Sequence, residues 1–367
     1  MNALFLDPGV SGGPETYLRG LAPAIARARP DVELTVVTTH SGATTLAADG
    51  WTDFARIVAL NCEDGQRLRR QVAEQIKLPS LARARRFDVL HSLASIGPVW
   101  TPGVRHVVTL HDVTFMHQKT FGPATTAGMK AIVAGAARDA DALLSGTAAA
   151  RDDVCATLGL DPAQFVVAHH GRRPAPPAEG LPIARVTAEH DLAGRRVVLC
   201  VGAKRPHKNQ GLLVRALPSL PDDVVLALVG HPEPYDRELR ELAESLGVTG
   251  RVRFIDYVPD ADLEALFRLA DAFGFPTLGE GFGLPVIEAL DRGLPVACSS
   301  IPVLREVGGD AVHLFDPYDP ASAAAAVSGA LLDGDRIRTA GPAWAARFTW
   351  DAAAQATLDA YDRALRA

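Results

Sequence analysis

The amino-acid sequence predicts an α/β protein built from two doubly wound domains, each with a parallel sheet. Three observations predict this fold. Short runs rich in Val, Leu and Ile alternate with longer helical stretches, the alternation occurs in both halves of the chain, and a proline-rich segment separates the halves. Strands that are apolar along their whole length are typical of parallel sheets covered by helices. Their alternation with helices indicates right-handed βαβ units.

The expected strands are distributed over both halves. The first half contains residues 3–6, 33–38, 56–60, 88–91, 106–111, 142–145 and 165–168. The second half contains residues 196–201, 224–229, 251–255, 272–275, 295–298 and 311–315. The segment 349–367 is expected to form one helix, whose packing the sequence leaves open.

The proline-rich segment, residues 171–180, has the sequence GRRPAPPAEG. Proline lacks an amide donor and has a fixed φ angle, so this segment cannot form a central strand or a helix interior. We expect the linker near residues 171–193, a first domain at 1–175, a second at 176–350 and the C-terminal helix at 351–367. Doubly wound domains bind ligands at the carboxyl ends of their strands, which predicts a site in the cleft between the domains.

Composition limits the class of protein. The 367 residues suggest two domains, and the net charge of −6 disfavours a nucleic-acid partner. The four cysteines are widely spaced, which argues against a disulfide scaffold or a zinc site and fits a reducing compartment. The N-terminus is expected to be a buried strand and not a signal peptide, and no apolar run is long enough for a spanning helix. These features predict a cytoplasmic enzyme.

The most specific local pattern is PTLGEGFGLPVIEA at residues 276–289. Gly281 and Gly283 allow close approach of the backbone to a ligand, and Pro285 suits the first turn of a helix. The N-terminus of that helix would be an anion site. Glu280 lies before the helix and Glu288 inside it, so the pattern suits a hydroxyl-rich ligand that carries phosphate. The alternative for Glu288 is an ordinary solvated helix residue.

A second pattern, VGAKRPHKN at residues 201–209, follows the first strand of the second half. Three cations and a histidine within five residues can neutralise a diphosphate. The alternative is an exposed basic turn.

Two patterns in the first half follow strands. His111 is expected at the carboxyl end of a strand, facing the ligand, unless it is a core residue or is satisfied by Asp112. Residues 7–15, DPGVSGGPE, contain a literal G-x-S-x-G, but only one strand precedes them, which argues against a nucleophilic serine. We interpret them as a flexible, amide-rich turn. His169 and His170 lack a partner pattern and are interpreted as structural, as is His117.

Together these residues resemble a known family. The E-x7-E pattern of Glu280 and Glu288, the block EGFGLP at 280–285, the later GLPV at 293–296 and REVGGDA at 305–311 resemble the retaining glycosyltransferases of family 4. The resemblance implies the GT-B architecture, in which two Rossmann-like domains face each other across a cleft. It also implies transfer of a sugar from a nucleotide-sugar donor with retention at the anomeric carbon and without a bound metal.

The resemblance implies roles for residues of the second, donor-side domain. Lys208 would hold the donor diphosphate. Glu280 and the amides of Phe282, Gly283 and Leu284 would lie against the donor sugar. Fixed cations and a helix dipole would stabilise the charge that accumulates on the leaving diphosphate.

Further implied roles concern the ribose and the first, acceptor-side domain. Glu288 would accept hydrogen bonds from the ribose hydroxyls. His111 would sit near the sugar and the reacting face, and Gly12 and Gly13 would approach the phosphate. We assign no covalent intermediate, and expect the departing phosphate to take the acceptor's proton.

One departure from the family concerns Ala203, because many members carry arginine directly after the glycine of the basic turn. We hypothesise that Lys204 or Arg205 supplies the missing charge.

The sequence alone does not identify the donor sugar or the acceptor. The P-x-K-N form of the basic turn resembles members that act in polysaccharide assembly with mannose-like or rhamnose-like donors, so GDP- or UDP-linked sugars are candidates. A glycan, a lipid-linked oligosaccharide or a small molecule could be the acceptor. Two alternatives to transfer are a sugar-nucleotide epimerase or phosphorylase on the same scaffold, and a non-catalytic nucleotide-sugar binding protein.

A lipid-linked acceptor would require a peripheral contact at the inner face of the membrane. An arginine-rich segment could supply it, although a solvated basic helix is an equally good interpretation. The cluster consists of Arg67, Arg69, Arg70, Arg83, Arg85 and Arg86.

Overall fold

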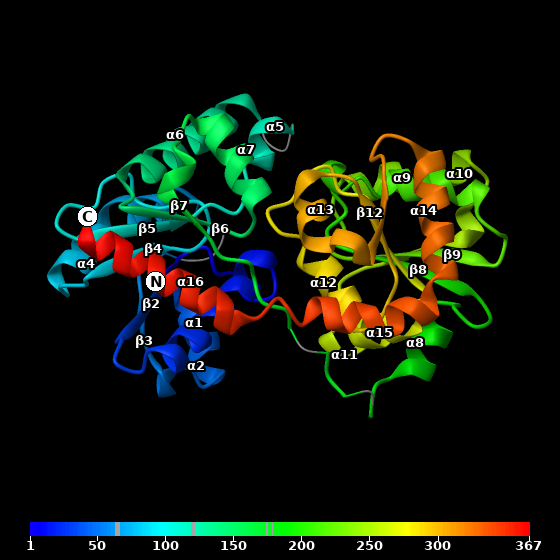
Figure 1. The fold of residues 1–367 in the computed structure, drawn as a ribbon, viewed down its shortest axis with the longest axis horizontal. Coiled ribbons are helices and arrows are strands. Elements are labelled where there is room, and N and C mark those ends of the chain that lie inside the picture. Colours follow the sequence, from blue (N-terminus) through cyan, green and yellow to red (C-terminus); the bar gives the residue numbers. More distant parts are fainter. Residues whose placement is uncertain (63–66, 119–121, 174, 178) are drawn as a thin grey trace. The chain divides into compact units, whose positions relative to one another are not determined.

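The structure, a computed structural model, describes residues 1–62, 67–118, 122–173, 175–177 and 179–367. The chain divides into two compact units (Figure 1): unit 1 comprises Met1–Gly171 with Thr349–Ala367, and unit 2 comprises Arg172–Phe348. The boundary therefore follows residue 171 and not residue 175, and the C-terminal helix is part of unit 1 and not a separate segment. Pro174 and Ala178 of the expected linker lie outside the described residues.

Within the described residues, unit 1 contains a seven-stranded sheet in which every strand pair is parallel. The strand order is β3-β2-β1-β4-β5-β6-β7. The strands are β1 (Asn2–Ala3), β2 (Leu34–Thr38), β3 (Ala55–Ala59), β4 (Val89–Ser92), β5 (Arg105–Thr109), β6 (Ala142–Ser145) and β7 (Phe165–Val167). The first strand is shorter than predicted, because the chain turns after Ala3 and the Leu6 amide donates to the Ala3 carbonyl at 3.0 Å.

The helices of unit 1 connect these strands and cover the sheet. They are α1 (Gly13–Ala28), α2 (His40–Ala48), α3 (Arg67–Val72), α4 (Leu78–Ala84), α5 (Thr114–His117), α6 (Pro123–Asp139), α7 (Ala148–Leu158) and α16 (Trp350–Arg366). A π-helical turn at Ala73–Lys77 joins α3 to α4. Successive strand residues pack on opposite faces: Val36 contacts the cluster that contains α1 and α16, whereas Val37 contacts the cluster that contains α4. This two-sided burial is the physical reason for the continuous apolar runs.

The C-terminal helix α16 packs against α1 and against strands β5, β6 and β7. Two glycines make room for the indole of Trp350, the first residue of the helix. A Cβ atom on Gly20 would lie 2.0 Å from the Trp350 Cε2 atom, and one on Gly171 would lie 2.3 Å from the Trp350 amide nitrogen. This close packing holds the end of the chain in unit 1.

Within the described residues, unit 2 contains a six-stranded parallel sheet in the order β10-β9-β8-β11-β12-β13. The strands are β8 (Arg196–Val201), β9 (Val224–Val229), β10 (Val252–Ile255), β11 (Ala272–Phe275), β12 (Val296–Ser299) and β13 (Val312–Phe315). Three of them have the predicted bounds, and the other three begin one residue later than predicted. The helices are α8 (Ile183–Glu189), α9 (Gln210–Ala216), α10 (Tyr235–Ser245), α11 (Asp260–Leu269), α12 (Leu284–Asp291), α13 (Pro302–Gly308), α14 (Pro320–Leu332) and α15 (Gly334–Ala345).

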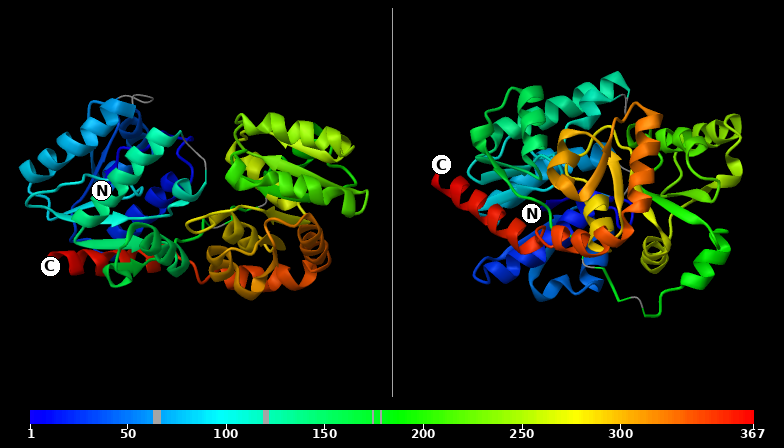
Figure 2. Two further views of the ribbon diagram at one scale, coloured as in Figure 1. Left: turned by 90° about the horizontal axis from the view of Figure 1, so that it is seen from above. Right: turned by 45° about the vertical axis from the view of Figure 1, so that its right-hand side comes forward.

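The order of the strands in unit 2 reverses between β8 and β11. The helix after β8, α9, packs in the apolar cluster that contains Val198, whereas the helix after β11, α12, packs in the cluster that contains Val197. The two helices therefore cover opposite faces of the sheet, and Figure 2 shows helices on both sides of it. Such a reversal opens a crevice at the carboxyl ends of the two strands. The predicted α/β class with two parallel sheets is confirmed.

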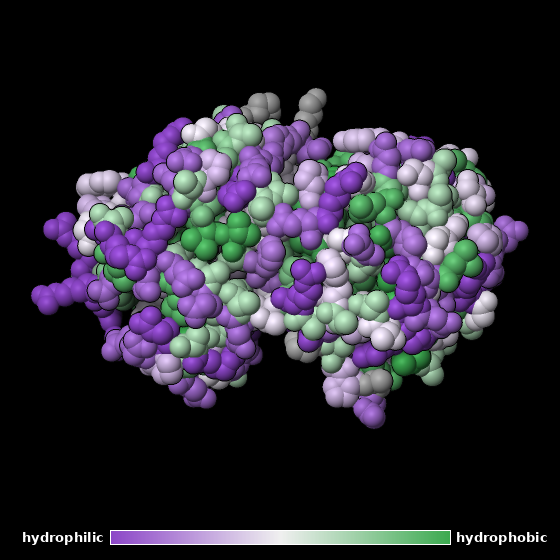
Figure 3. Space-filling view, viewed as in Figure 1, coloured by the Kyte–Doolittle hydropathy of each residue, from purple (hydrophilic) through white to green (hydrophobic). Residues whose placement is uncertain are grey.

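The face of the protein drawn in Figure 3 is mixed in polarity. On the face drawn in Figure 3, hydrophilic residues are interspersed with smaller hydrophobic areas. Among the described residues, none of the helices combines the length and the apolar character needed to cross a lipid bilayer.

Candidate active site

The loop after β8 begins with a close approach of two backbone segments. Gly202 has a φ of 152° and Gly230, after β9, has a φ of 149°. A Cβ atom on Gly230 would lie 2.3 Å from the Gly202 carbonyl oxygen. Only glycine fits here, so the loop after β8 is held against the carboxyl end of β9.

Lys204 in this loop is fully buried and bonded to the protein. Its ammonium donates to the carbonyl oxygens of Gly230 at 2.8 Å and Ile255 at 3.0 Å. It also lies 3.6 Å from a carboxylate oxygen of Asp236 and 3.7 Å from one of Asp256. Burial lowers the pKa of Lys204, and the two carboxylates partly oppose this effect. Its full burial and these bonds leave no surface of Lys204 for a diphosphate.

Arg205 next to it is exposed. Its guanidinium makes an ion pair with Glu233, with 2.7 Å between Nη2 and Oε1. Of the two cations that could compensate for Ala203, Arg205 is therefore the one that a ligand can reach.

Lys208 and Glu280 are brought into direct contact. Lys208 ends a 3₁₀ turn after β8, Glu280 lies in the loop after β11, and the Lys208 Nζ atom is 2.5 Å from the Glu280 Oε1 atom. The Lys208 ammonium also lies 5.7 Å from the centre of the Phe275 ring. The two loops are joined by a backbone hydrogen bond, in which the Leu278 amide donates to the His207 carbonyl at 2.8 Å. The ion pair thus sits beyond the carboxyl ends of β8 and β11, where the strand order reverses.

The N-terminus of α12 lies in the same loop. Gly283 caps the helix with a φ of 93°, and a Cβ atom there would lie 2.6 Å from the Leu304 Cδ2 atom. The Phe282 ring is buried and packs edge-on against Phe348, with 5.6 Å between ring centres. Leu284 is the first helical residue, and the first amides of a helix have no partner within it. Helix ends of this kind can bind an anion.

Glu288 lies one turn inside α12 and is half-buried. Burial raises its pKa, and the nearby cations Arg173 and Arg292 partly oppose this effect. The Arg292 guanidinium donates to the Glu288 carbonyl oxygen at 2.8 Å and pairs with the buried Glu264 at 2.6 Å. The carboxylates of Glu264 and Asp260 act in the same direction as burial, so it is burial and not a surplus of cations that distinguishes Glu288 from an ordinary solvated helix residue.

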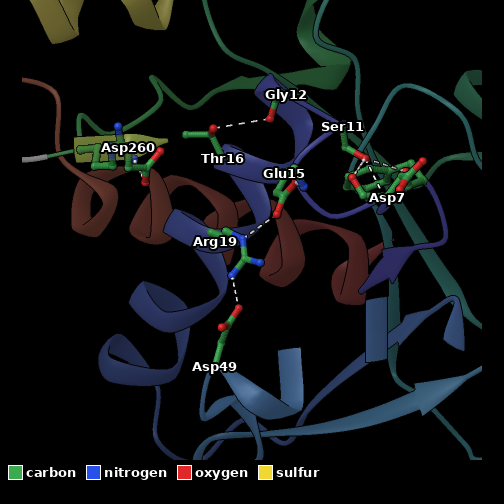
Figure 4. A network of polar contacts seen from close by, with 11 residues as sticks. Asp7, Ser11, Gly12, Glu15, Thr16, Arg19, Asp49 and Asp260 are labelled. Carbon is green, nitrogen blue, oxygen red and sulfur yellow. Dashed lines mark hydrogen bonds and ion pairs between the residues drawn. The ribbon is translucent and has the colours of Figure 1, made fainter. Parts of the chain in front are cut away.

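In unit 1, Gly12 and Gly13 form the start of α1, as Figure 4 shows for Gly12. Gly12 has a φ of 59°, and a Cβ atom on either glycine would meet no atom within 4 Å. The Ser11 hydroxyl accepts from the Asp7 amide at 2.7 Å and donates to the Phe5 carbonyl at 2.9 Å. Ser11 therefore stabilises the turn, in agreement with the rejection of a nucleophilic serine.

Glu15 closes the same turn from the first turn of α1. Its carboxylate accepts from the Gly9 amide at 3.0 Å and pairs with Arg19 at 2.8 Å, while Arg19 also pairs with Asp49 at 2.7 Å (Figure 4). The turn is held by its own side chains, and the two glycines remain open to the surroundings.

His111 follows β5, as predicted, and its ring is held by the protein. The Nε2 atom lies 2.7 Å from the Leu93 carbonyl oxygen, and the Nδ1 atom lies 3.3 Å from the Nε2 atom of His170. The His111 amide donates to the Ser95 hydroxyl at 3.0 Å. Sequence reasoning assigned His170 no more than a structural role. His170 follows β7 just as His111 follows β5, and these matching positions could have predicted that the two histidines lie together.

Within each unit, then, the structure brings together some of the predicted residues. Lys208 contacts Glu280, and α12 follows directly, whereas Arg205 is directed to Glu233. Across the described ranges, no group of three or more His, Cys, Asp or Glu side chains is arranged to hold a metal ion.

Residues 187–343 match the family model for Glycosyl transferases group 1, and residues 11–175 match the model for Glycosyltransferase Family 4. The O-antigen chain mannosyltransferase B of Escherichia coli is 37% identical over 195 residues, which cover 51% of this chain and 50% of the relative. The D-inositol 3-phosphate glycosyltransferase of Salinispora tropica is 32% identical over 249 residues, which cover 62% of this chain and 52% of the relative. The chain thus spans about half the length of these curated relatives.

Solved structures share the fold over nearly the whole chain. HepE of Anabaena, in complex with UDP and glucose, has a TM-score of 0.74 at 20% identity, covering 96% of this chain and 97% of that one. WaaG, a glycosyltransferase involved in lipopolysaccharide biosynthesis, has a TM-score of 0.65 at 18% identity, covering 97% and 95%. The fold is that of the GT-B glycosyltransferases. With the two family models matching consecutive parts of the sequence, the chain belongs to the family 4 glycosyltransferases.

Proposed function

We propose that the protein is a retaining glycosyltransferase that moves a sugar from a nucleotide-diphosphate donor to a glycan, lipid-linked or small-molecule acceptor without a metal ion. The observation that carries the proposal is the Lys208–Glu280 pair beside the N-terminus of α12, at the reversal of strand order in unit 2. The names of the Escherichia coli relatives support a mannose-like sugar, with a rhamnose-like sugar as the alternative.

The contacts of Lys208 suggest how the diphosphate is held. An ammonium has three N–H donors, and Glu280 takes one of them. The remaining donors can bind phosphate oxygens, while Glu280 keeps the ammonium oriented. The N-terminus of α12 adds a partial positive charge, and Arg205 is an accessible further cation. Cations of the protein would thus take the place that a metal ion has in other transferases.

The reaction that follows from this arrangement breaks the bond between the anomeric carbon and the phosphate oxygen. The electron pair of that bond stays on the diphosphate, which Lys208 and the helix end stabilise. A new bond forms between the anomeric carbon and the acceptor hydroxyl, and the hydroxyl proton passes to the departing phosphate. Glu288 would accept hydrogen bonds from the ribose, and Gly12 and Gly13 would allow the backbone of unit 1 to approach the phosphate.

The experiment is nucleotide release from GDP-mannose, UDP-glucose and a rhamnose nucleotide, with and without a panel of acceptors. Transfer predicts release that depends on the acceptor, a product with the anomeric configuration of the donor, and rates that EDTA does not change. A Lys130→Ala variant, altered at an exposed lysine of α6, serves as the control for surface charge. An epimerised sugar, phosphate-dependent cleavage, or binding without turnover would each refute transfer and support the corresponding alternative.

We further infer a peripheral contact with anionic lipid at the helical segment from α3 to α4. Arg69, Val72, Ile76 and Arg83 are exposed and recur at helical spacing, which places two apolar side chains between two cations on one face. Gln75 bonds this segment to the Gly97 carbonyl at 2.8 Å and to the Val99 amide at 3.0 Å. The side chain of Arg67 lies outside the described residues.

Sedimentation with vesicles tests this contact. We expect binding to vesicles that contain phosphatidylglycerol, weaker binding to phosphatidylcholine alone, and loss of binding in the Ile76→Asp and Arg69→Glu/Arg83→Glu variants. Lys130→Glu, a charge reversal of the same sign elsewhere, is the control. Equal sedimentation of all variants would refute a contact at this segment and leave the transfer reaction unaffected.

A further inference from the structure

His111 belongs to a cluster of rings with Tyr17 of α1, His170 after β7 and Trp350 of α16. The Tyr17 ring contacts His111 edge-on at 5.0 Å and His170 at 4.6 Å between ring centres. The ring of Trp350 stacks on His170 at 6.1 Å. His170 is buried.

The hydrogen bonds of the two histidines determine their protonation. A backbone carbonyl only accepts hydrogen bonds, so the His111 Nε2 atom that contacts the Leu93 carbonyl must carry a hydrogen. In a neutral ring the Nδ1 atom is then an acceptor, and the His170 Nε2 atom that faces it must be the donor. Burial lowers the pKa of His111 and lowers that of His170 further, which favours the neutral form of both rings, while a hydrogen bond with the Ala168 backbone opposes this effect at His170.

The position of Tyr17 is fixed by a buried chain of hydroxyl and imidazole groups. The Tyr17 hydroxyl lies 3.2 Å from the Thr109 hydroxyl, which lies 2.7 Å from the His91 Nε2 atom. The His91 Nδ1 atom lies 2.7 Å from the Tyr361 hydroxyl on α16. The wall against which the histidine pair packs is therefore part of the core of unit 1.

We propose that His170 is a positioning residue that holds His111 as a neutral ring with its hydrogen on Nε2. The proposal rests on the proposed function and on the place near the reacting sugar that the family resemblance implies for His111. Because the protein occupies both ring nitrogens, His111 presents a fixed neutral surface and does not carry the acceptor's proton. This assignment agrees with proton transfer to the departing phosphate.

The proposal predicts how His111 responds to loss of its partner. The titratable groups that face His111 are Tyr17 of α1, His91 of β4, His170 after β7 and Asp112 of its own loop. Replacing His170 with phenylalanine keeps the ring and removes the hydrogen bond to Nδ1. Since that bond favours the neutral ring, its loss raises the pKa of His111.

Nitrogen-15 NMR of histidine-labelled protein measures this response without reference to activity. We expect the wild-type His111 signal, assigned with a His111→Asn variant, to show the Nε2–H tautomer. In His170→Phe we expect the His111 pKa to rise by about 0.5–1 unit, the size of one neutral hydrogen bond. The His170→Asn variant, whose side-chain amide can still donate, should restore part of the wild-type value. His169→Asn, at the exposed neighbouring histidine, is the matched control.

Transferase kinetics provide the second measurement. We expect His170→Phe to lower kcat at least fivefold with little change in the donor KM, to move the acid limb of the pH profile upward, and to be partly rescued in His170→Asn. A His111 ring with its hydrogen on Nδ1, or an unchanged titration in His170→Phe, would overturn the proposal. If the NMR result holds but no donor sugar is transferred, the positioning stands and the proposed function fails.

Discussion

Replacing Lys204 with methionine tests whether this lysine stabilises unit 2 or serves the substrate. Methionine keeps most of the apolar stem and removes the ammonium. The carbonyl groups of Gly230 and Ile255 then lose their donor in a buried position. Asp236 and Asp256 lose a neighbouring cation, although Asp236 keeps an ion pair with Arg240 at 2.6 Å.

The size of the effect follows from these contacts. Hydrogen bonds to a charged group contribute about 1.5–3 kcal/mol each, and removing one partner of a buried ion pair costs about 3–5 kcal/mol. Asp256 is exposed and Asp236 retains Arg240, so the loss falls toward the lower end of that range. We expect Lys204→Met to lower the free energy of unfolding of unit 2 by about 3 kcal/mol.

Calorimetry and urea denaturation of the whole chain measure this loss, and the neighbouring Arg205→Met variant is the control. The exposed pair of Arg205 with Glu233 should contribute no more than about 1 kcal/mol. If Arg205 supplies the charge that Ala203 lacks, its variant should instead raise the donor KM. A Lys204→Met protein that loses less than about 1 kcal/mol, or whose donor KM rises with unchanged stability, would refute the structural role of Lys204.

Three further predictions concern the site and its support. Lys208→Ala and Glu280→Ala should each lower kcat/KM at least tenfold, which corresponds to about 1.4 kcal/mol. Because the two side chains form one ion pair, the double variant should lose less than the sum of the two single losses. Additive losses would contradict this. Glu288→Gln should raise the donor KM and also raise Tm at neutral pH. Because the pKa of Glu288 is higher in the folded state, its contribution to stability is full in acid and is lost as the pH rises through that pKa, so the gain in Tm should vanish near pH 4. Gly20→Ala should cost about 1–3 kcal/mol in thermal denaturation because its Cβ atom meets Trp350, and Trp350→Leu in the same chain should restore part of the loss.

The strands of unit 2 could be predicted from the sequence because each one is buried on both faces of the sheet and is therefore a continuous apolar run. Residues 197–201 are apolar on both faces, and the structure shows alternate residues packing into two different clusters. The same reasoning gave wrong bounds for the first strand of unit 1, which ends at Ala3 and not at Leu6. Leu4 and Leu6 are as buried as strand residues, but a turn places them in the core, and burial alone cannot distinguish the two conformations.

In the site, too, the sequence predicts the type of residue, whereas packing decides which residues are buried and which partners they contact. The cationic turn at residues 204–208 was predicted as one unit, since charge is visible in the sequence. Burial then separates its members: Lys204 bonds to backbone carbonyls in the core, whereas Lys208 reaches Glu280. The role of His170 was not predicted because its partner His111 is far away in the sequence. The two residues meet only because the loops after β5 and β7 lie close together in the fold.

The topology of the sheet explains why two distant patterns form one site in unit 2. Lys208 and Glu280 are far apart in the chain, but β8 and β11 are neighbours in the sheet, and parallel strands present their following loops at the same edge. Because α9 and α12 then leave toward opposite faces, the two loops separate beyond the ion pair, next to the N-terminus of α12. The hydrogen bond from Leu278 to His207 holds the loops at this distance. The reversal of strand order between β8 and β11 therefore brings the Lys208 ammonium next to the Glu280 carboxylate and the N-terminus of α12, although Lys208 is far from both in the sequence.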